Sequence, residues 1–235
     1  MSIAVHLLSL PLKTNLLRSI LLFLLFVKTH GYAQIRASIS TDLSLVRNFS
    51  TDQHFWALGQ TVQGNFHFSK KETVYAWVNY FVNGKFRNNR TATAKPGQSP
   101  DMINYKVKSV WNAREISIRL KHYWIGAFNS ETGWNIYSIA GLGLNWTNVE
   151  NIFTPAFDTA HYNYYAPIEG SGQFTRLTLD LGGGVEKSLG GNFFLYGDLR
   201  TALPASDYPS PWTANNKNVP LPLILGFGAR ILFGY

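Results

Sequence analysis

The sequence contains no cysteine, and only 14% of its 235 residues are charged. The absence of cysteine excludes a disulfide scaffold, a thiolate metal site and a lipid-modified cysteine anchor. Long apolar runs are also scarce, because the run at residues 20–27 is shorter than the about 20 residues that a membrane-spanning helix needs. The exported chain is therefore expected to obtain its stability from backbone pairing and side-chain packing.

Aromatic residues and glycine are abundant instead. Phe, Trp and Tyr make up 15% of the chain, which also has 20 glycines and seven tryptophans, an unusual composition for a soluble domain. The mean hydropathy of −0.07 argues against a helical membrane protein but suits a β-barrel with one wet face. The basic residues form no organised stripe, so nucleic-acid binding is not predicted.

An export signal is predicted at the N-terminus. Lys13 and Arg18 precede the apolar run, and the small residues Gly31 and Ala33 stand where a signal peptidase reads them. We expect residues 1–33 to be removed before Gln34, which leaves 34–235 as a single domain. Removal takes away three of the 21 Lys and Arg and none of the 13 Asp and Glu, so the remaining charge is 18 − 13 = +5.

Alternating apolar and polar residues predict strands throughout the rest of the chain. Eight segments alternate, at 34–47, 55–68, 73–83, 110–126, 134–147, 174–187, 192–203 and 222–235. After a modest loop at 48–54, short turns at 69–72, 127–133 and 188–191 alternate with long loops at 84–109, 148–173 and 204–221. This alternation is typical of transmembrane barrels. We predict an all-β, eight-stranded antiparallel up-and-down transmembrane β-barrel, with a soluble sandwich or secreted barrel as the alternative.

Charged residues lie on the strand faces opposite the rows of Leu, Val and Phe. Such charges would cost about 2–4 kcal/mol each if they faced lipid, so they are assigned to the lumen. We expect them to form an ion-pair network that closes the barrel, with Asp180 opposite Arg200. A gated or selective ion path is the alternative. The predicted network comprises Arg36, Asp42, Glu115, Arg119, Lys121, Arg176, Asp180, Glu186, Asp198, Arg200 and Arg230.

Two features of the strands need a separate interpretation. A two-residue turn at Lys70-Lys71 would place polar residues of the second strand on the same face as Val74, Val78 and Val82, so a bulge or another register is expected there. The glycine clusters at 141–143 and 182–184 lie inside strands, where they are expected to permit bending or to make room for bulky neighbours across the lumen. A phosphate loop would instead have to lead into a helix.

The sequence shows no arrangement that indicates catalysis. An acyl-transfer site would need a hydroxyl nucleophile beside a base, usually His, with an orienting group. His54 and His161 fall in predicted outer loops, His67 lies near an inner turn, and His122 shares a strand face with Trp124. No cofactor, metal site or catalytic residue is therefore predicted. A Ser–His pair within hydrogen-bond reach at the membrane boundary would revive the hypothesis of a lipid-modifying enzyme.

The predicted outer loops carry the candidate contact residues. Aromatic side chains there would suit a binding surface for an unknown extracellular ligand, but they would equally suit a lid over the barrel or contact with lipid headgroups. These candidates are Tyr162, Tyr164, Tyr165, Tyr208 and Trp212. Basic residues of the second outer loop are candidates for pairing with the phosphates of lipopolysaccharide, namely Arg87, Arg90, Lys95, Lys106 and Lys108.

The C-terminal segment indicates a family resemblance. Residues 222–235 alternate bulky with small side chains and end on an aromatic residue. Together with the glycine-rich strands, the ending Ala229 to Tyr235 resembles the small eight-stranded bacterial outer-membrane barrels of the OmpA-barrel, OmpX and OmpW type. Tyr235 stands where phenylalanine is commonest in that family.

This resemblance implies a location in the outer membrane, contact with its lipids and lipopolysaccharide, and an assembly signal at Ile231, Phe233 and Tyr235 that the barrel-assembly machinery reads. The implied function is non-enzymatic, in envelope structure or in surface interaction through the outer loops. A conduit for small apolar molecules, as in the OmpW type, is the first alternative. A lipid-modifying outer-membrane enzyme is the second.

Overall fold

The computed structural model describes residues 36–49, 52–205, 211–213 and 222–234. The predicted export signal, Tyr208 and Tyr235 lie outside these residues. Residues 36–235 form one compact unit. No helix in the described part of the chain is long and apolar enough to cross a membrane.

Eight long antiparallel strands close into a ring. In chain order the strands of the described chain are β1 (Arg36–Asn48), β2 (Phe55–His67), β3 (Glu72–Ala94), β4 (Met102–Ile125), β5 (Trp134–Thr154), β6 (Tyr162–Asn163), β7 (Gly170–Gly190), β8 (Phe193–Pro204) and β9 (Pro222–Phe233). The ring order is β1-β2-β3-β4-β5-β7-β8-β9, closed by the pairing of β9 with β1. The short β6 pairs only with the end of β3. The prediction of an eight-stranded antiparallel up-and-down barrel is confirmed.

Burial in this barrel is inverted relative to a soluble protein. Leu43, Ile118 and Phe227 are 72%, 67% and 69% exposed, whereas Arg119 and Arg230 are 2% and 0% exposed. The outward side chains of the strands are mainly apolar, whereas the lumen holds the buried polar and charged side chains together with aromatic and aliphatic ones. An exposed apolar surface of this extent does not suit a soluble monomer. It disfavours the alternative of a soluble sandwich or secreted barrel.

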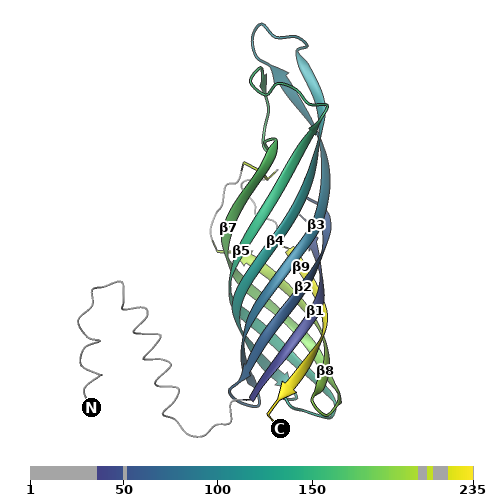
Figure 1. Ribbon diagram of the computed structural model, residues 1–235, viewed down its shortest axis with the longest axis vertical. Coiled ribbons are helices and arrows are strands. Elements are labelled where there is room, and N and C mark those ends of the chain that lie inside the picture. Colours follow the sequence, from purple (N-terminus) through teal and green to yellow (C-terminus); the bar gives the residue numbers. More distant parts are fainter. Residues whose placement is uncertain (1–35, 50–51, 206–210, 214–221, 235) are drawn as a thin grey trace, which may run out of the picture. The chain divides into compact units, whose positions relative to one another are not determined.

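The two ends of the barrel differ, as Figure 1 shows. At one end, here called the turn end, lie the connections 68–71, 126–133 and 191–192 together with the start of β1 and the end of β9. The other end, the loop end, has the connections 95–101 and 155–169 together with the ends of β1 and β8 and the starts of β2 and β9. β3, β4, β5 and β7 rise beyond the other strands at the loop end (Figure 1).

The predicted long loops are wrong in part, because the strands continue into them. β3 runs to Ala94 and β4 begins at Met102, so only 95–101 of the predicted loop 84–109 is a connection. β5 likewise runs to Thr154. We call residues 84–94, 102–111 and 148–154 the extension. Its outward side chains are mostly charged or polar, with Met102, Val110 and Ile152 among them, whereas those of the barrel are mainly apolar. This explains why the segments resembled loops in the sequence.

The register between β2 and β3 corrects the predicted two-residue turn. Phe68 N donates to Glu72 O at 3.1 Å, and Thr61 pairs with Asn79 while Val62 pairs with Val78. The polar row of β2 therefore faces the lumen, and the valines of β3 face outward. The bulge occurs elsewhere, between Phe81 and Gly84 in the β3–β4 ladder.

Candidate functional site: the lumen and the extension

An ion pair and an inserted aromatic side chain close the turn end of the lumen. Arg230 donates from Nε to Glu186 Oε2 at 2.8 Å and from Nη2 to Glu186 Oε1 at 2.6 Å. It also donates to the backbone oxygen of Phe128 at 2.7 Å. Phe128 belongs to the 126–133 turn, yet its ring is buried and stacks on His67 at 4.2 Å between ring centres. The turn thus folds into the barrel mouth, which the sequence did not indicate.

Two arginines stack on Trp77 in the middle of the lumen. The guanidinium carbon of Arg119 lies 3.2 Å from the centre of the Trp77 ring, and that of Arg200 lies 4.7 Å from it. Trp77 is fully buried. Contact with its π system therefore offsets part of the repulsion between these two like charges.

Each of these arginines binds two carboxylates. Arg119 Nη2 lies 3.1 Å from Glu115 and 2.9 Å from Asp180. Such charge-assisted bonds are short and strong, and the desolvation of buried charges makes them necessary.

Arg200 in turn lies 3.3 Å from Asp42 and 2.9 Å from Asp198. Tyr196, Gln63 and Ser44 also donate to Asp42. The predicted pairing of Asp180 with Arg200 is wrong, because Asp180 stands opposite Ala202 and Arg200 stands opposite Gly182. A register shift between Ser188 and Gly190 at the β7–β8 turn sets this alignment.

Lys121 lies in the lumen but is held differently from the predicted ion pairs. Its Nζ lies within 6 Å of four tyrosine rings, those of Tyr75, Tyr123, Tyr137 and Tyr196, and Tyr137 is nearest at 4.2 Å. It forms no ion pair with a described carboxylate. The ion pairs join three arginines to five carboxylates, which leaves an excess of negative charge among them. Lys121 adds a positive charge nearby and is held by cation–π contacts.

The two remaining residues of the predicted network lie toward the ends of the lumen. The guanidinium carbon of Arg36 is 5.8 Å from the Phe128 ring at the turn end. That of Arg176 is 4.6 Å from the Phe174 ring at the loop end. The structure therefore brings eight of the eleven predicted residues into ion pairs.

Glycines of the wall make room for these groups. A Cβ added to Gly143 would lie 2.6 Å from Thr178 Oγ1 and 2.8 Å from Glu115 Oε1, and one added to Gly141 would lie 2.6 Å from Arg119 Cγ. In the second cluster, a Cβ on Gly184 would lie 2.6 Å from the Tyr137 hydroxyl. The expected role of the glycine clusters in accommodating bulky neighbours is confirmed.

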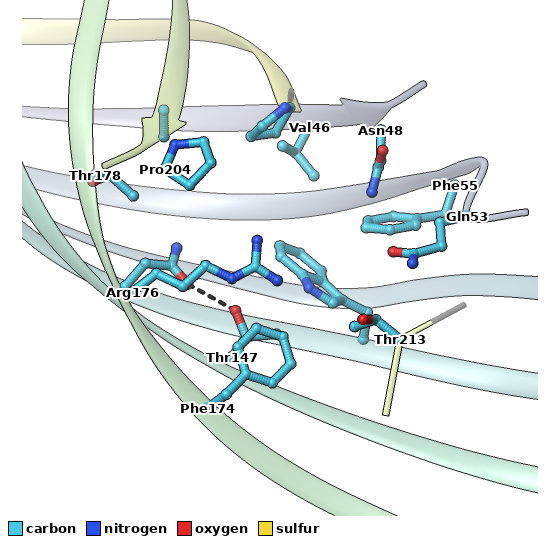
Figure 2. Close-up of a pocket in the computed structure, with 14 residues that line it drawn as sticks. Val46, Asn48, Gln53, Phe55, Thr147, Phe174, Arg176, Thr178, Pro204 and Thr213 are labelled. Carbon is cyan, nitrogen blue, oxygen red and sulfur yellow. Dashed lines mark hydrogen bonds between the residues drawn. The ribbon is translucent and has the colours of Figure 1, made fainter. Parts of the chain in front are cut away.

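Above the ion pairs the lumen is apolar. Phe55, Phe81, Phe86 and Trp111 pack with small aliphatic residues, and the rings of Phe55 and Trp111 are 4.9 Å apart. A cavity of about 60 Å³ adjoins this layer, and Figure 2 shows Phe55, Phe174 and Arg176 around it. Thr147 Oγ1 donates to Asn145 in its wall at 2.7 Å. A cavity of this size holds water and is far smaller than a typical ligand pocket.

The extension has its own aromatic cluster on the face that continues the lumen. Tyr105, Phe153 and Phe157 stack at 4.8–5.6 Å, and Tyr162 and Tyr164 of the 155–169 segment pack onto them. Burial raises the pKa of the Tyr105 phenol above its usual value. Lys95 Nζ donates to the backbone oxygen of residue 160 at 2.7 Å, which ties the β3–β4 connection to this segment.

The candidate contact residues do not share one surface. Tyr162 is 8% exposed and belongs to the aromatic cluster, whereas Tyr165 is 83% exposed. Trp212 packs so closely over Gly172 that a Cβ there would lie 2.2 Å from the indole. Of the basic candidates, Arg90 pairs with Asp52 at 3.0 Å, while Arg87, Lys106 and Lys108 are exposed on the outward face of the extension.

The histidines form no open catalytic arrangement. A hydrogen bond of 2.9 Å does join Ser38 Oγ and His67 Nε2, and Thr73 Oγ1 lies 2.7 Å from His67 Nδ1. This pair lies in the lumen rather than at the lipid boundary, no carboxylate orients the ring, and Ser38 is 1% exposed. His122 is on the outward face, where it pairs with Glu72 and contacts Trp124. No metal-binding group of His and carboxylate residues occurs within the described residues.

Comparison with known proteins identifies the architecture but no sequence relative. No protein-family model and no curated protein matches the chain. Among solved structures, neisserial surface protein A is 12% identical with a TM-score of 0.52, covering 84% of this chain and 97% of that one. Ail of Yersinia pestis is 11% identical (TM-score 0.47, 85% and 99% covered), and OprG of Pseudomonas aeruginosa is 12% identical (0.47, 87% and 99%). The chain thus has the architecture of the small eight-stranded outer-membrane barrels, as its C-terminal segment and glycine-rich strands predicted.

Proposed function

We propose that the protein is an integral outer-membrane barrel with a closed lumen, without enzymatic activity, that serves envelope structure or surface interaction through its loop end. The observation that carries this proposal is the combination of an apolar exterior with a lumen filled by buried ion pairs and aromatic side chains. An apolar belt requires lipid around it. The loop end, with its extension, is then the part that faces the outside of the cell.

Three successive layers support a closed lumen. Phe128 and the Arg230–Glu186 pair fill the turn end. The Trp77 group fills the middle and the layer around Phe55 fills the loop end. Eight strands leave an interior just wide enough for side chains, so these side chains leave no diffusion path while the ion pairs hold them in place.

Single-channel conductance of the purified protein in a planar bilayer tests the closed lumen. The parent should show no steady conductance, and leak should appear in Asp180→Ala and Arg200→Ala, each of which opens one of the Trp77 ion-pair groups. Leu142→Ala, on the outward face of β5, is the matched control and should stay silent. A large, stable conductance in the parent would refute the proposal, and silence in both lumen variants would show that the ion pairs are not what closes the barrel.

Fractionation and N-terminal sequencing test the location. The protein should sediment with outer membranes, resist alkaline extraction and begin at Gln34. A protein that is released into the soluble fraction, or that retains residues 1–33, would contradict the proposed location or the predicted processing, respectively.

One observation favours a second candidate, a conduit for small apolar molecules. The upper lumen is lined by Phe55, Phe81, Phe86 and Trp111, the composition such a conduit would need near its outer rim. Such a conduit would also need a lateral opening between strands or an apolar pocket. The β3–β4 ladder is continuous apart from the bulge, and the adjoining cavity is only about 60 Å³, which argues against both. Titration with toluene, followed by the indole NMR signals, distinguishes the two. A saturable shift at Trp111 but not at the exposed Trp124 would support the conduit, and equal shifts at both would exclude a specific site.

A further inference from the structure

The outward face of β3, β4, β5 and β7 changes chemistry in regular steps toward the loop end. Cross-strand neighbours define its rows, the last apolar one being Val78, Ile116, Leu144 and Leu177. The next row contains Tyr80, Arg114, Trp146 and Thr175, and the row above it contains Asn112, Asn148 and Gln173. The face therefore passes from apolar to aromatic and cationic, and then to amide, within four residues of each strand.

This face is hollowed where the rows change. A depression of about 550 Å³ is bordered by Val78, Tyr80, Arg114 and Trp146, and a second of about 350 Å³ lies over Val110, Glu150 and Ser171. The two share Asn112, Asn148 and Gln173 in their walls, so they adjoin. The guanidinium of Arg114 lies over the Tyr80 ring at 5.3 Å. A concave surface in which aromatic rings stand beside amide and charged side chains can hold a ligand that is itself part apolar and part polar.

Positive charges gather further toward the loop end. Arg87 stands directly opposite Lys108, with Lys85 opposite Val110 and Lys106 opposite Asn89. None of these four residues, nor Arg114, forms an ion pair with any described carboxylate. Like charges directly opposite each other destabilise a strand pair. A bound polyanion would offset this repulsion.

We propose that this face binds lipopolysaccharide, the phosphorylated glycolipid of the outer leaflet. Acyl chains would lie along the Val78–Ile116 row, Arg114 would bind a phosphate at the lipid boundary, the amide row would bind sugar hydroxyls, and the Arg87–Lys108 group would bind phosphates of the core sugars. The inference rests on the proposed outer-membrane location, but not on the closed lumen.

The height of the Arg87–Lys108 group above Arg114 favours lipopolysaccharide over a phospholipid as the ligand. Lys108 precedes Arg114 by six residues of β4 and lies nearer the loop end. Six residues span about 20 Å along the strand, which corresponds to about 15 Å of height for a strand tilted by about 40°. The headgroup layer of an ordinary bilayer leaflet is only about 5–8 Å deep. A phospholipid bound at Arg114 would therefore not reach Lys108, whereas a phosphorylated sugar core would.

Binding of defined lipids to the purified protein in phospholipid nanodiscs tests the site. The probes are lipopolysaccharide with a phosphorylated inner core, the same material after dephosphorylation, and bisphosphorylated lipid A. Arg114→Gln should weaken both phosphorylated lipids about tenfold or more, since it removes a charged hydrogen-bond donor. The double variant Arg87→Gln/Lys108→Gln should weaken lipopolysaccharide similarly and leave lipid A binding within about twofold, because lipid A lacks the core.

Arg47→Gln is the matched control. Arg47 also lies over aromatic rings on the outward face, 5.0 Å from Trp56 and 5.6 Å from Phe49, but on β1, away from the depressions. It should leave binding unchanged. Equal loss in Arg47→Gln, or undiminished binding of dephosphorylated lipid, would overturn the proposed site, as would equally tight binding of the soluble core oligosaccharide alone. The conductance and fractionation experiments report on the proposed function separately, so the two failures are distinguishable.

Discussion

Breaking the Arg230–Glu186 pair should destabilise the barrel strongly. Both side chains are fully buried, and Arg230 makes two bonds of 2.6 and 2.8 Å to Glu186 and one of 2.7 Å to the Phe128 backbone oxygen. Without Arg230, Glu186 would keep only longer contacts, 3.5 Å from Tyr123 and 3.4 Å from Asn135. Removing one partner of a buried pair costs about 3–5 kcal/mol, because the other charge remains buried without compensation. We expect this loss for Arg230→Leu and for Glu186→Leu.

The double variant Arg230→Leu/Glu186→Leu separates the pair energy from simple loss of packing. It should be less destabilised than the sum of the single variants by about 2–3 kcal/mol, since neither charge is then left alone. The assay is urea-induced unfolding of the protein in phospholipid vesicles, followed by tryptophan fluorescence and by the heat-modifiable mobility of the folded barrel. Lys70→Ala, in an exposed turn, is the control. Single variants within about 1 kcal/mol of the parent, or strictly additive losses, would refute the reasoning.

Two further predictions use the same unfolding assay, and a third measures the amount of folded barrel in outer-membrane fractions. Gly143→Ala should destabilise the barrel, because its Cβ would lie within 2.6–2.9 Å of Thr178 and the Arg119-bound carboxylates, whereas Gly64→Ala, with nothing within 4 Å, should be neutral or slightly stabilising. Trp77→Ala should cost about 3–5 kcal/mol through the cavity alone, and a loss below about 1 kcal/mol would show that the lumen closes around the missing ring. Phe233→Ala should lower the amount of folded barrel in outer-membrane fractions more than Phe227→Ala does, and equal effects would count against an assembly signal at the C-terminus.

The barrel itself could be predicted from the sequence because each strand lies between two uniform surroundings. An apolar surrounding on one side and a packed lumen on the other preserve the alternation of apolar and polar residues along each strand. This alternation alone was enough to assign Arg119 and Arg230 to the interior correctly. The extension could not be found this way. Above the belt the outward positions carry Lys85, Arg87 and Lys108, and the apolar row that marks a strand is no longer present on that face.

Which charged residues lie in the lumen could be predicted from the sequence, but which of them pair with each other was harder to predict. One residue more or less in a turn moves a charge to another partner. The β7–β8 turn falls at 191–192, one residue beyond the expected centre near Gly190, and this places Arg200 opposite Gly182 rather than Asp180. Phe128 enters the lumen from a turn, where no periodicity constrains it. The tyrosines around Lys121 come from β3, β4, β5 and β8, so only the closed ring brings them together.

The polarity of β3 and β4 inverts along their length, and this inversion marks where the proposed membrane belt would end. Below the level of Tyr80 and Arg114, these strands place Ile116 outward and Glu115 inward. Above it, they place Lys108 outward and Val107 inward. Lipid and the lumen beside it have low dielectric constants, so buried charges there must be paired, whereas charges in water need no partner. The buried ion pairs of the lumen therefore belong to the level of the belt. The unpaired cations of the extension, such as Lys108, belong to the level above it, where a soluble or lipid-borne anion can reach them.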